Sequence, residues 1–339
     1  MTLMREETKA APEVVARQLA ANRAPLEELG ARLRSRPPRH MLTLARGSSD
    51  HAAGYFARLA MRYSGRPCAS LPLSLTTLEK TAWQLDGALA LGISQSGRSH
   101  DLIESLAAVR RGGAQTYALV NDPDAPLAGE ADEVLALHAG VEQSVAATKS
   151  FIATLAAGAS LVAAWHRDRA LLEALEHLPE ALSRALELDW LSGIERLAGA
   201  DRLLVIGRGD GLPVALEAAL KFKETCALQA EAFSGAEVQH GPMTLVGPGY
   251  PVLIFATEGP GQQGLVELAE TFRERGACVL LAADEGVAGR DLTIAPAPHP
   301  ALAPICAIQS FYLMVEALSR ATHNDPDQPR FLQKVTRTR

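Results

Sequence analysis

Paired cysteines, long hydrophobic runs and clustered histidines are all missing from this chain of 339 residues. Its four cysteines lie far apart and form no CxxC pair, so we expect reduced thiols. None of the nine histidines has a metal-ligand spacing such as HxxxH, and we therefore predict no metal site. The longest apolar run, 151–165, is shorter than the roughly 20 residues that a membrane span needs, and it predicts a buried helix.

An excess of positive charge is also absent. A net charge of −6 and a pI near 5.9 argue against a broad nucleic-acid surface, although a small anionic ligand needs only a local site. The first eleven residues carry charges and no apolar core, so we expect no signal peptide and a cytoplasmic protein with neither membrane nor nucleic-acid partners. The content of 47% hydrophobic and 21% charged residues is typical of a folded globular protein of one large or two smaller units.

The chain contains two pairs of similar stretches at a nearly constant offset. In the first pair an apolar strand is followed by an Arg-Gly turn, and the arginines, Arg46 and Arg208, are 162 positions apart. In the second pair a strand, a loop and a helix end at a glycine, and the glycines, Gly113 and Gly276, are 163 positions apart. Similar offsets at two landmarks indicate an internal duplication. The matched stretches are 41–49 with 203–210, and 89–122 with 252–284.

Strands that alternate with helices of this length predict parallel sheets covered by helices on both faces. We therefore expect an α/β fold of two tandem doubly wound parallel-sheet domains, each a flavodoxin-like three-layer α/β/α sandwich. In such sheets ligands bind beyond the carboxyl ends of the strands. The expected parts are an N-terminal helical segment (1–35), a first α/β domain (36–166), a helical linker (167–197), a second α/β domain (198–322) and a C-terminal tail (323–339).

A hydroxyl-rich turn, 93–99, follows an apolar strand and precedes a helix-like segment at about 101–109. Such a turn directs backbone N–H groups and serine hydroxyls at whatever lies over the helix N-terminus, where the helix dipole favours negative charge. The turn suits a phosphate group, although Ser and Gly are also common in an ordinary capping turn. The corresponding segment of the second half, 257–260, contains Glu258, which should repel a phosphate. We therefore expect the phosphate site in the first half.

The second half carries candidate catalytic residues on an expected helix at 212–228. Lys221 and Glu224 are three residues apart and share a face, a spacing that in most helices means a solvated surface pair. Apolar residues crowd this helix, so its polar face is narrow and Glu224 is expected to be partly desolvated and suited to moving protons. His240 precedes a Gly-Pro turn, where a lone histidine is usually structural, and Lys334 lies on a basic tail, which is usually frayed.

Seven short motifs follow one another along the chain: Ala45-Arg-Gly-Ser-Ser49, Ser94-Gln-Ser-Gly97, Ser144-Val-Ala-Ala-Thr-Lys149, Gly207-Arg-Gly209, Leu220-Lys-Phe-Lys-Glu224, Glu237-Val-Gln-His-Gly-Pro242 and Asp327-Gln-Pro-Arg-Phe-Leu-Gln-Lys334. Together they resemble the double sugar-isomerase (SIS) domain of glucosamine-6-phosphate synthase and its relatives. The resemblance covers nearly the whole chain, and seven motifs in order make it highly specific. It implies two tandem SIS domains.

The resemblance implies a role for each matching residue. Glu224 would move the proton between C1 and C2 of the sugar, with Lys221 close by. His240 would open the sugar ring, and Lys334 would meet the carbonyl or imine end. The family also implies no cofactor and a homodimer in which His240 reaches the neighbouring subunit's site. The phosphosugar would be bound by Ser48, Ser49, Ser94, Gln95, Ser96, Ser99 and Val145.

The resemblance is closest to stand-alone glucosamine-6-phosphate deaminases of the family. The synthase has a glutaminase domain, for which this sequence holds no counterpart, so we expect glucosamine-6-phosphate and water to give fructose-6-phosphate and ammonia. A fructosamine-6-phosphate deglycase, or another aldose–ketose aminosugar-phosphate isomerase, would keep the fold and change the substrate. A sugar-phosphate sensor would not need Glu224, His240 and Lys334 together. Arg98 stands where the synthase has an acid, and it either strengthens phosphate binding or faces solvent, which we favour.

Overall fold

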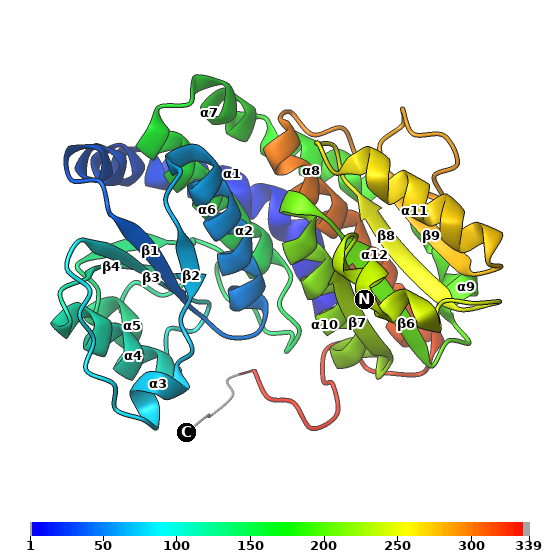
Figure 1. The fold of residues 1–339 in the computed structure, drawn as a ribbon, viewed down its shortest axis with the longest axis horizontal. Helices are drawn as coiled ribbons and strands as arrows, with labels where there is room; N and C mark the ends of the chain where they lie inside the picture. The colour runs from blue at the N-terminus through cyan, green and yellow to red at the C-terminus, as the bar shows by residue number, and fades with distance from the viewer. Residues whose placement is uncertain (1, 335–339) are drawn as a thin grey trace. The chain divides into compact units, whose positions relative to one another are not determined.

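The computed structural model describes residues 2–334 and contains two five-stranded sheets whose strand pairs are all parallel (Figure 1). The first sheet consists of β1 (His40–Leu44), β2 (Cys68–Ser70), β3 (Ala88–Ser94), β4 (Gln115–Val120) and β5 (Glu133–Ala136). The second consists of β6 (Arg202–Gly207), β7 (Gln229–Ser234), β8 (Pro251–Ala256), β9 (Cys278–Ala283) and β10 (Leu292–Thr293). Their orders, β2-β1-β3-β4-β5 and β7-β6-β8-β9-β10, are equivalent, which confirms the duplicated α/β fold.

Helices connect the strands of each sheet. In the first half they are α2 (Ser48–Ser64), α3 (Ser74–Thr77), α4 (His100–Arg111), α5 (Pro126–Gly129) and α6 (Lys149–His166), preceded by α1 (Leu3–Ser35). The helices α7 (Arg169–Glu176), α8 (Leu178–Glu187) and α9 (Ile194–Leu197) come before the second sheet, which carries α10 (Leu212–Cys226), α11 (Gln262–Glu274) and α12 (Ala303–Ala321). Short 3-10 segments lie at 191–193, 209–211, 237–240, 242–245 and 300–302.

The two sheets bury equivalent side chains. Leu42 and Leu44 of β1 belong to a buried cluster that includes α4, because alternate residues of a strand face the same side of the sheet. Leu204 and Ile206 of β6, which lie 162 positions later, belong to the corresponding cluster with α11. The duplication therefore extends from the sequence pattern to the core positions.

The chain divides into two compact units. Within the described residues, one contains 2–12, 143–148 and 177–332, and the other contains 13–142, 149–176 and 333–334. The first turns of α1 thus belong to the unit of the second sheet, and the rest of α1 belongs to the unit of the first. The segment boundaries expected from the sequence stay a prediction.

α1 continues through Pro12, although proline has no backbone N–H to give to the carbonyl four residues earlier. That carbonyl belongs to Thr8, which is fully buried. The side-chain amide of Gln309, on α12, donates to it at 2.8 Å. A buried carbonyl that proline would leave without a partner is therefore satisfied by a helix from the other end of the sequence.

Two helices are buried along nearly their whole length. One is α6, which confirms that the apolar run at 151–165 is a buried helix. The other is the segment Pro300–Ala321, the one helix in the described part of the chain that is long and apolar enough to cross a membrane. All of its apolar window is buried within the fold, so its composition matches that of a core helix.

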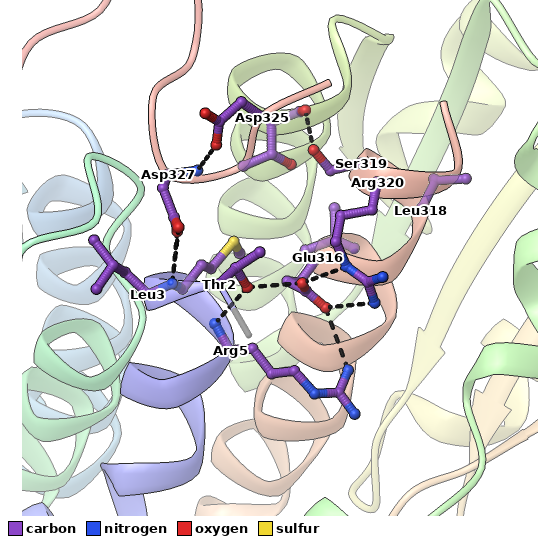
Figure 2. Close-up of polar contacts among 12 residues, drawn as sticks. Thr2, Leu3, Arg5, Glu316, Leu318, Ser319, Arg320, Asp325 and Asp327 are labelled. Carbon is purple, nitrogen blue, oxygen red and sulfur yellow. Dashed lines mark hydrogen bonds and ion pairs between the residues drawn. The ribbon is translucent and has the colours of Figure 1, made fainter. Parts of the chain in front are cut away.

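Glu316, on α12, is a buried carboxylate with three hydrogen-bond partners (Figure 2). Thr2 Oγ1 and Arg320 Nε each donate to it at 2.7 Å, and Arg5 Nη1 donates at 3.3 Å. Burial would raise the pKa of Glu316, but the hydrogen bonds from Arg320, Thr2 and Arg5 outweigh burial and lower that pKa. The start of α1 is thereby joined to the end of α12.

We expect Glu316→Gln to lower the free energy of unfolding by about 1–3 kcal/mol near neutral pH, because hydrogen bonds to a charged group are lost. A carboxylate whose pKa is lowered on folding stabilises the protein above its unfolded pKa of about 4.5, and this stabilisation is lost as the pH falls through the folded pKa. The difference between variant and wild type should therefore shrink below pH 4.5. Urea unfolding at several pH values measures it, and a difference that grows in acid would contradict this account.

Candidate active site

The first sheet brings two helix N-termini to neighbouring strand ends. β1 and β3 are paired, and the chain leaves them toward opposite sides of the sheet, which is the position where such folds bind ligands. α2 begins at Ser48 directly after β1, and Ser99 is the N-cap of α4 after β3. Both helix N-termini favour an anion, so this edge suits the predicted phosphate.

The turn after β3 is fixed by its own residues. Ser94 Oγ accepts a hydrogen bond from the backbone N–H of Gly97 at 3.1 Å. Gly97 has a φ of 60°, and a Cβ there would lie 2.5 Å from the Cβ of Ala125, so the turn requires glycine. Ser94 is buried, whereas the other first-half candidates are half-buried: Ser48, Ser49, Gln95, Ser96 and Ser99.

Two arginines flank this turn and both pair with acids. Arg98 is 57% exposed and its Nη2 lies 3.1 Å from Asp122 Oδ2, which supports the interpretation that it faces solvent. Arg46 Nη2 lies 3.0 Å from the buried carboxylate of Asp101, in the first turn of α4. Arg46 therefore links the turn after β1 to the helix that follows β3.

Val145 differs from the serine candidates, because the structure places it in the unit of the second sheet. It is half-buried, and its backbone N–H donates to the carbonyl of Asp327 at 3.3 Å. The structure thus brings Val145 next to the C-terminal tail, an arrangement that the sequence motifs do not indicate.

Lys221 and Glu224 form the predicted pair near the C-terminal end of α10. Lys221 Nζ donates to Glu224 Oε2. The Lys221 side chain is 1% exposed and that of Glu224 is 21% exposed, so this is not a solvated surface pair. Glu224 lies at the border of the core, with a buried ammonium on one side.

Glu217 is a third member of this cluster that sequence analysis missed. Its fully buried carboxylate lies 3.3 Å from Lys221 Nζ and accepts a hydrogen bond from the Tyr312 hydroxyl at 3.1 Å. Burial would lower the pKa of Lys221, but the carboxylates of Glu217 and Glu224 outweigh burial and raise it. Lys221 is therefore an ammonium between two carboxylates. The four-residue spacing from Glu217 to Lys221 is the sequence signal that could have found the pair.

The second half places its candidate base at the opposite edge of its sheet from the turn 207–209. α10 starts after the carboxyl end of β6 and returns to the amino end of β7. Glu224, near the end of α10, therefore lies on the side of the sheet where the amino ends of the strands are. The turn 207–209 lies at the carboxyl edge, where the parallel-sheet rule places ligands. The two halves therefore share a fold but carry their candidate residues at different edges.

His240 and Lys334 lie on segments outside the sheets. His240 is exposed at the end of a 3-10 segment that follows β7. Lys334 Nζ lies 3.1 Å from Glu142 Oε2, a fully buried carboxylate that also accepts hydrogen bonds from Ser150 N at 3.1 Å and Ser150 Oγ at 2.6 Å. Lys334 is therefore held by an ion pair, and Glu142 is a second acid that sequence analysis missed.

The described residues contain no group of three His, Cys, Asp or Glu side chains that could hold a metal ion. The four cysteines are free thiols, and burial raises the pKa of Cys306 to about 12.

Comparison with known proteins assigns the fold to a family. The sequence profile of the SIS domain matches residues 36–164 and 196–320, which is more than half of the chain. The chain belongs to the SIS domain family. Among its SIS relatives, the glutamine–fructose-6-phosphate aminotransferase (isomerizing) of Thermus thermophilus is 32% identical over 91% of this chain and 53% of that protein. The chain spans about half the length of the curated relatives it matches.

Solved SIS structures cover this chain almost completely. A candidate phosphosugar isomerase from Silicibacter pomeroyi DSS-3 is 41% identical, with a TM-score of 0.91 over 96% of this chain and 100% of that one. The C-terminal domain of the glucosamine-fructose-6-phosphate aminotransferase from Francisella tularensis is 25% identical, with a TM-score of 0.86 over 97% and 98%. This SIS chain is therefore homologous to the isomerase domain of that aminotransferase, which confirms the predicted resemblance.

Proposed function

We propose that this SIS protein is an enzyme that acts on a phosphosugar, and specifically an isomerising glucosamine-6-phosphate deaminase. The observation that carries the proposal is the cluster on α10, where the buried ammonium of Lys221 holds the partly exposed carboxylate of Glu224. A carboxylate fixed in this way is suited to moving a proton between carbons. Homology to the isomerase domain of an aminotransferase that acts on fructose-6-phosphate supports the choice of substrate class.

Glu224 takes a proton from C2 of the open-chain sugar and returns it to C1. One carboxylate can do both because the two carbons are adjacent. Loss of the C2 proton gives an enolamine, and protonation at C1 gives a C2 imine with a hydroxymethyl group at C1. Water then adds to the imine carbon and ammonia leaves, so the products are fructose-6-phosphate and ammonia. Water is the only co-substrate that the conversion of glucosamine-6-phosphate to fructose-6-phosphate and ammonia requires.

The remaining candidates bind and orient the sugar in this proposal. The serine-rich turns bind the phosphate, which lies away from the reacting carbons and supplies binding energy for orientation. His240 passes a proton during ring opening, since imidazole titrates near neutral pH. Lys334 brings positive charge to the carbonyl or imine end. A cytoplasmic location, a homodimer that shares residues between active sites, and the absence of a cofactor belong to the same proposal.

The test is a substrate panel with coupled assays for each product. Glucosamine-6-phosphate should yield fructose-6-phosphate and ammonia in equal amounts, and fructosamine-6-phosphates that carry an amino acid should yield nothing. Release of an amino acid and glucose-6-phosphate from the second substrate would replace the deaminase with a deglycase. Binding of phosphosugars with no turnover of any panel member would replace the enzyme with a sensor.

The phosphate site has its own test in the glycine of the serine-rich turn. Gly97→Ala should weaken fructose-6-phosphate binding by at least about tenfold, since the new methyl group would displace the turn. Gly65→Ala is the matched control, because Gly65 has a similar φ of 66° but no heavy atom within 4 Å of the added Cβ, and it lies at the other end of α2. Calorimetric titration measures both, and equal affinities of the two variants would place the phosphate elsewhere.

A further inference from the structure

The first three amides of α1 are hydrogen-bonded by side chains, two of them by Asp327, which lies more than 300 positions later. Figure 2 shows the bonds of Leu3 to Asp327 and of Arg5 to Thr2. Asp327 Oδ2 accepts from Leu3 N at 2.8 Å, and its Oδ1 accepts from Met4 N at 2.7 Å. Thr2 Oγ1 accepts from Arg5 N at 3.3 Å. The first amides of a helix have no partner inside the helix, and the helix dipole favours a negative charge there. Asp327 is therefore a two-oxygen cap on α1.

The tail that carries Lys334 has few other attachments. Within 325–333, every hydrogen bond to another segment in the described part of the chain involves Asp327. Its carboxylate caps α1, and its carbonyl accepts from Val145 N at 3.3 Å. Residues 330–333 are exposed. The course of the tail from 325 to 333 thus depends on Asp327 for its polar contacts with other segments, while Asn324, just before it, donates to the carbonyl of Cys226 at 3.3 Å.

The same end of α1 holds the loop that contains Val145. Glu7, three residues after Met4, is buried, and its carboxylate accepts from the backbone N–H groups of Gln143 and Ser144. The loop and the tail are therefore both attached to the first two turns of one helix. A displacement of those turns would move a predicted sugar-binding residue and the tail together.

We propose that Asp327 is a positioning residue, which acts by capping α1 and so fixes the tail that delivers the Lys334 ammonium. This inference rests on the proposed function, in which Lys334 meets the carbonyl or imine end of the sugar. Six residues, 328–333, separate the lysine from its anchor, and all of them except the buried Pro329 are exposed. A reacting group on such a segment needs the anchor to stay in its productive position.

Asp327→Asn tests the anchor because it keeps the side-chain shape but replaces one accepting oxygen with an NH₂ group that faces a backbone N–H. We expect kcat for glucosamine-6-phosphate to fall roughly tenfold, the size of effect that loss of a helix cap can produce, with little change in KM. Asp327→Ser keeps one acceptor, so its kcat should lie between that of wild type and that of Asp327→Asn. In a Lys334→Ala background the Asp327→Asn change should have no further effect on kcat, because the positioned group is gone.

Glu316→Gln is the matched control. Glu316 contacts Thr2 and Arg5 at the same end of α1, but it lies on α12 and not on the tail. This variant should lose stability and keep kcat close to that of wild type. Equal kcat losses in Glu316→Gln and Asp327→Asn, or an Asp327→Asn effect that persists in full without Lys334, would overturn the proposal in favour of general destabilisation.

Hydrogen–deuterium exchange tests whether Asp327 anchors the tail, and this measurement does not depend on turnover. Peptides that cover 143–148 and 325–334 should exchange faster in Asp327→Asn and Asp327→Ser than in wild type, and should be unchanged in Glu316→Gln. Equal exchange in all of these proteins would overturn the anchoring role. If wild type acts on no amino sugar phosphate, the proposed function fails, and the exchange result still decides whether Asp327 fixes the tail.

Discussion

Replacing Glu224 with glutamine should abolish most turnover of glucosamine-6-phosphate while leaving phosphosugar binding intact. Glutamine has nearly the same size and can still accept a hydrogen bond from Lys221, but its amide cannot take a proton from carbon. Because a positioned base contributes about 10²–10⁴-fold, kcat should fall at least about a hundredfold. The coupled assay measures kcat, and calorimetry with fructose-6-phosphate measures binding.

Glu274→Gln provides the control for this substitution. Glu274 is an exposed glutamate at the end of α11, so the same chemical change there should leave kcat as in wild type. A Glu224→Gln protein with undiminished turnover would exclude Glu224 as the base. Lost turnover together with lost binding would point instead to a disturbed site, which the retained hydrogen bond to Lys221 argues against.

Removing the ammonium at Lys221 should have the largest effect on stability. Methionine preserves the buried aliphatic stem but leaves the Glu217 carboxylate, which is fully buried, without its countercharge. Breaking a buried ion pair by removing one partner costs about 3–5 kcal/mol, so Lys221→Met should lower the free energy of unfolding by about that amount at pH 7. Urea unfolding measures it.

The double variant Lys221→Met/Glu217→Gln separates charge from packing. It leaves no unpaired charge at position 217, so part of the lost stability should return. The pH dependence is a second check. Because folding raises the pKa of Lys221, the ammonium's contribution is fully present below the unfolded value of 10.5 and is lost only as the pH rises through the folded pKa. If Lys221→Met alone were as stable as wild type, the stabilising role of the Lys221 ammonium would be contradicted.

Local patterns in the sequence were sufficient for the fold. The paired offsets between Arg46 and Arg208, and between Gly113 and Gly276, predicted the duplication that the equivalent strand orders confirm. Hydrophobic segments, turns and helix periodicity are properties of short stretches, and parallel α/β folds are built from such stretches in succession. The apolar run that forms α6 was predicted for the same reason.

The candidate site was predicted only where its residues are close in sequence. Lys221 and Glu224 lie on one helix turn, so their spacing predicted the pair. Glu217, the third member of the cluster, accepts a hydrogen bond from Tyr312, which is 95 positions away, and the spacing of a helix carries no information about such a partner. Asp327 contacts Leu3 across 324 positions, and Glu142 contacts Lys334 across 192.

The position of Glu224 relative to its sheet follows from the direction of α10, which the order of β6, α10 and β7 along the chain implies. A helix that follows a parallel strand must return to the opposite edge of the sheet, so Glu224 had to lie away from the turn 207–209. The rule that ligands bind at the carboxyl ends of strands agrees with the position of the predicted phosphate site in the first half. In the second half the candidate base is at the other edge.

The caps on α1 have a consequence for biosynthesis. The side chains that complete the hydrogen bonds of its first turns, Gln309 at Thr8 and Asp327 at Leu3 and Met4, are translated more than 300 residues after these turns. The backbone groups of these turns therefore lack their native partners until Gln309 and Asp327 have left the ribosome. Domains usually fold in the order in which they are synthesised. Here the first turns of α1 are synthesised well before the residues that complete their native contacts.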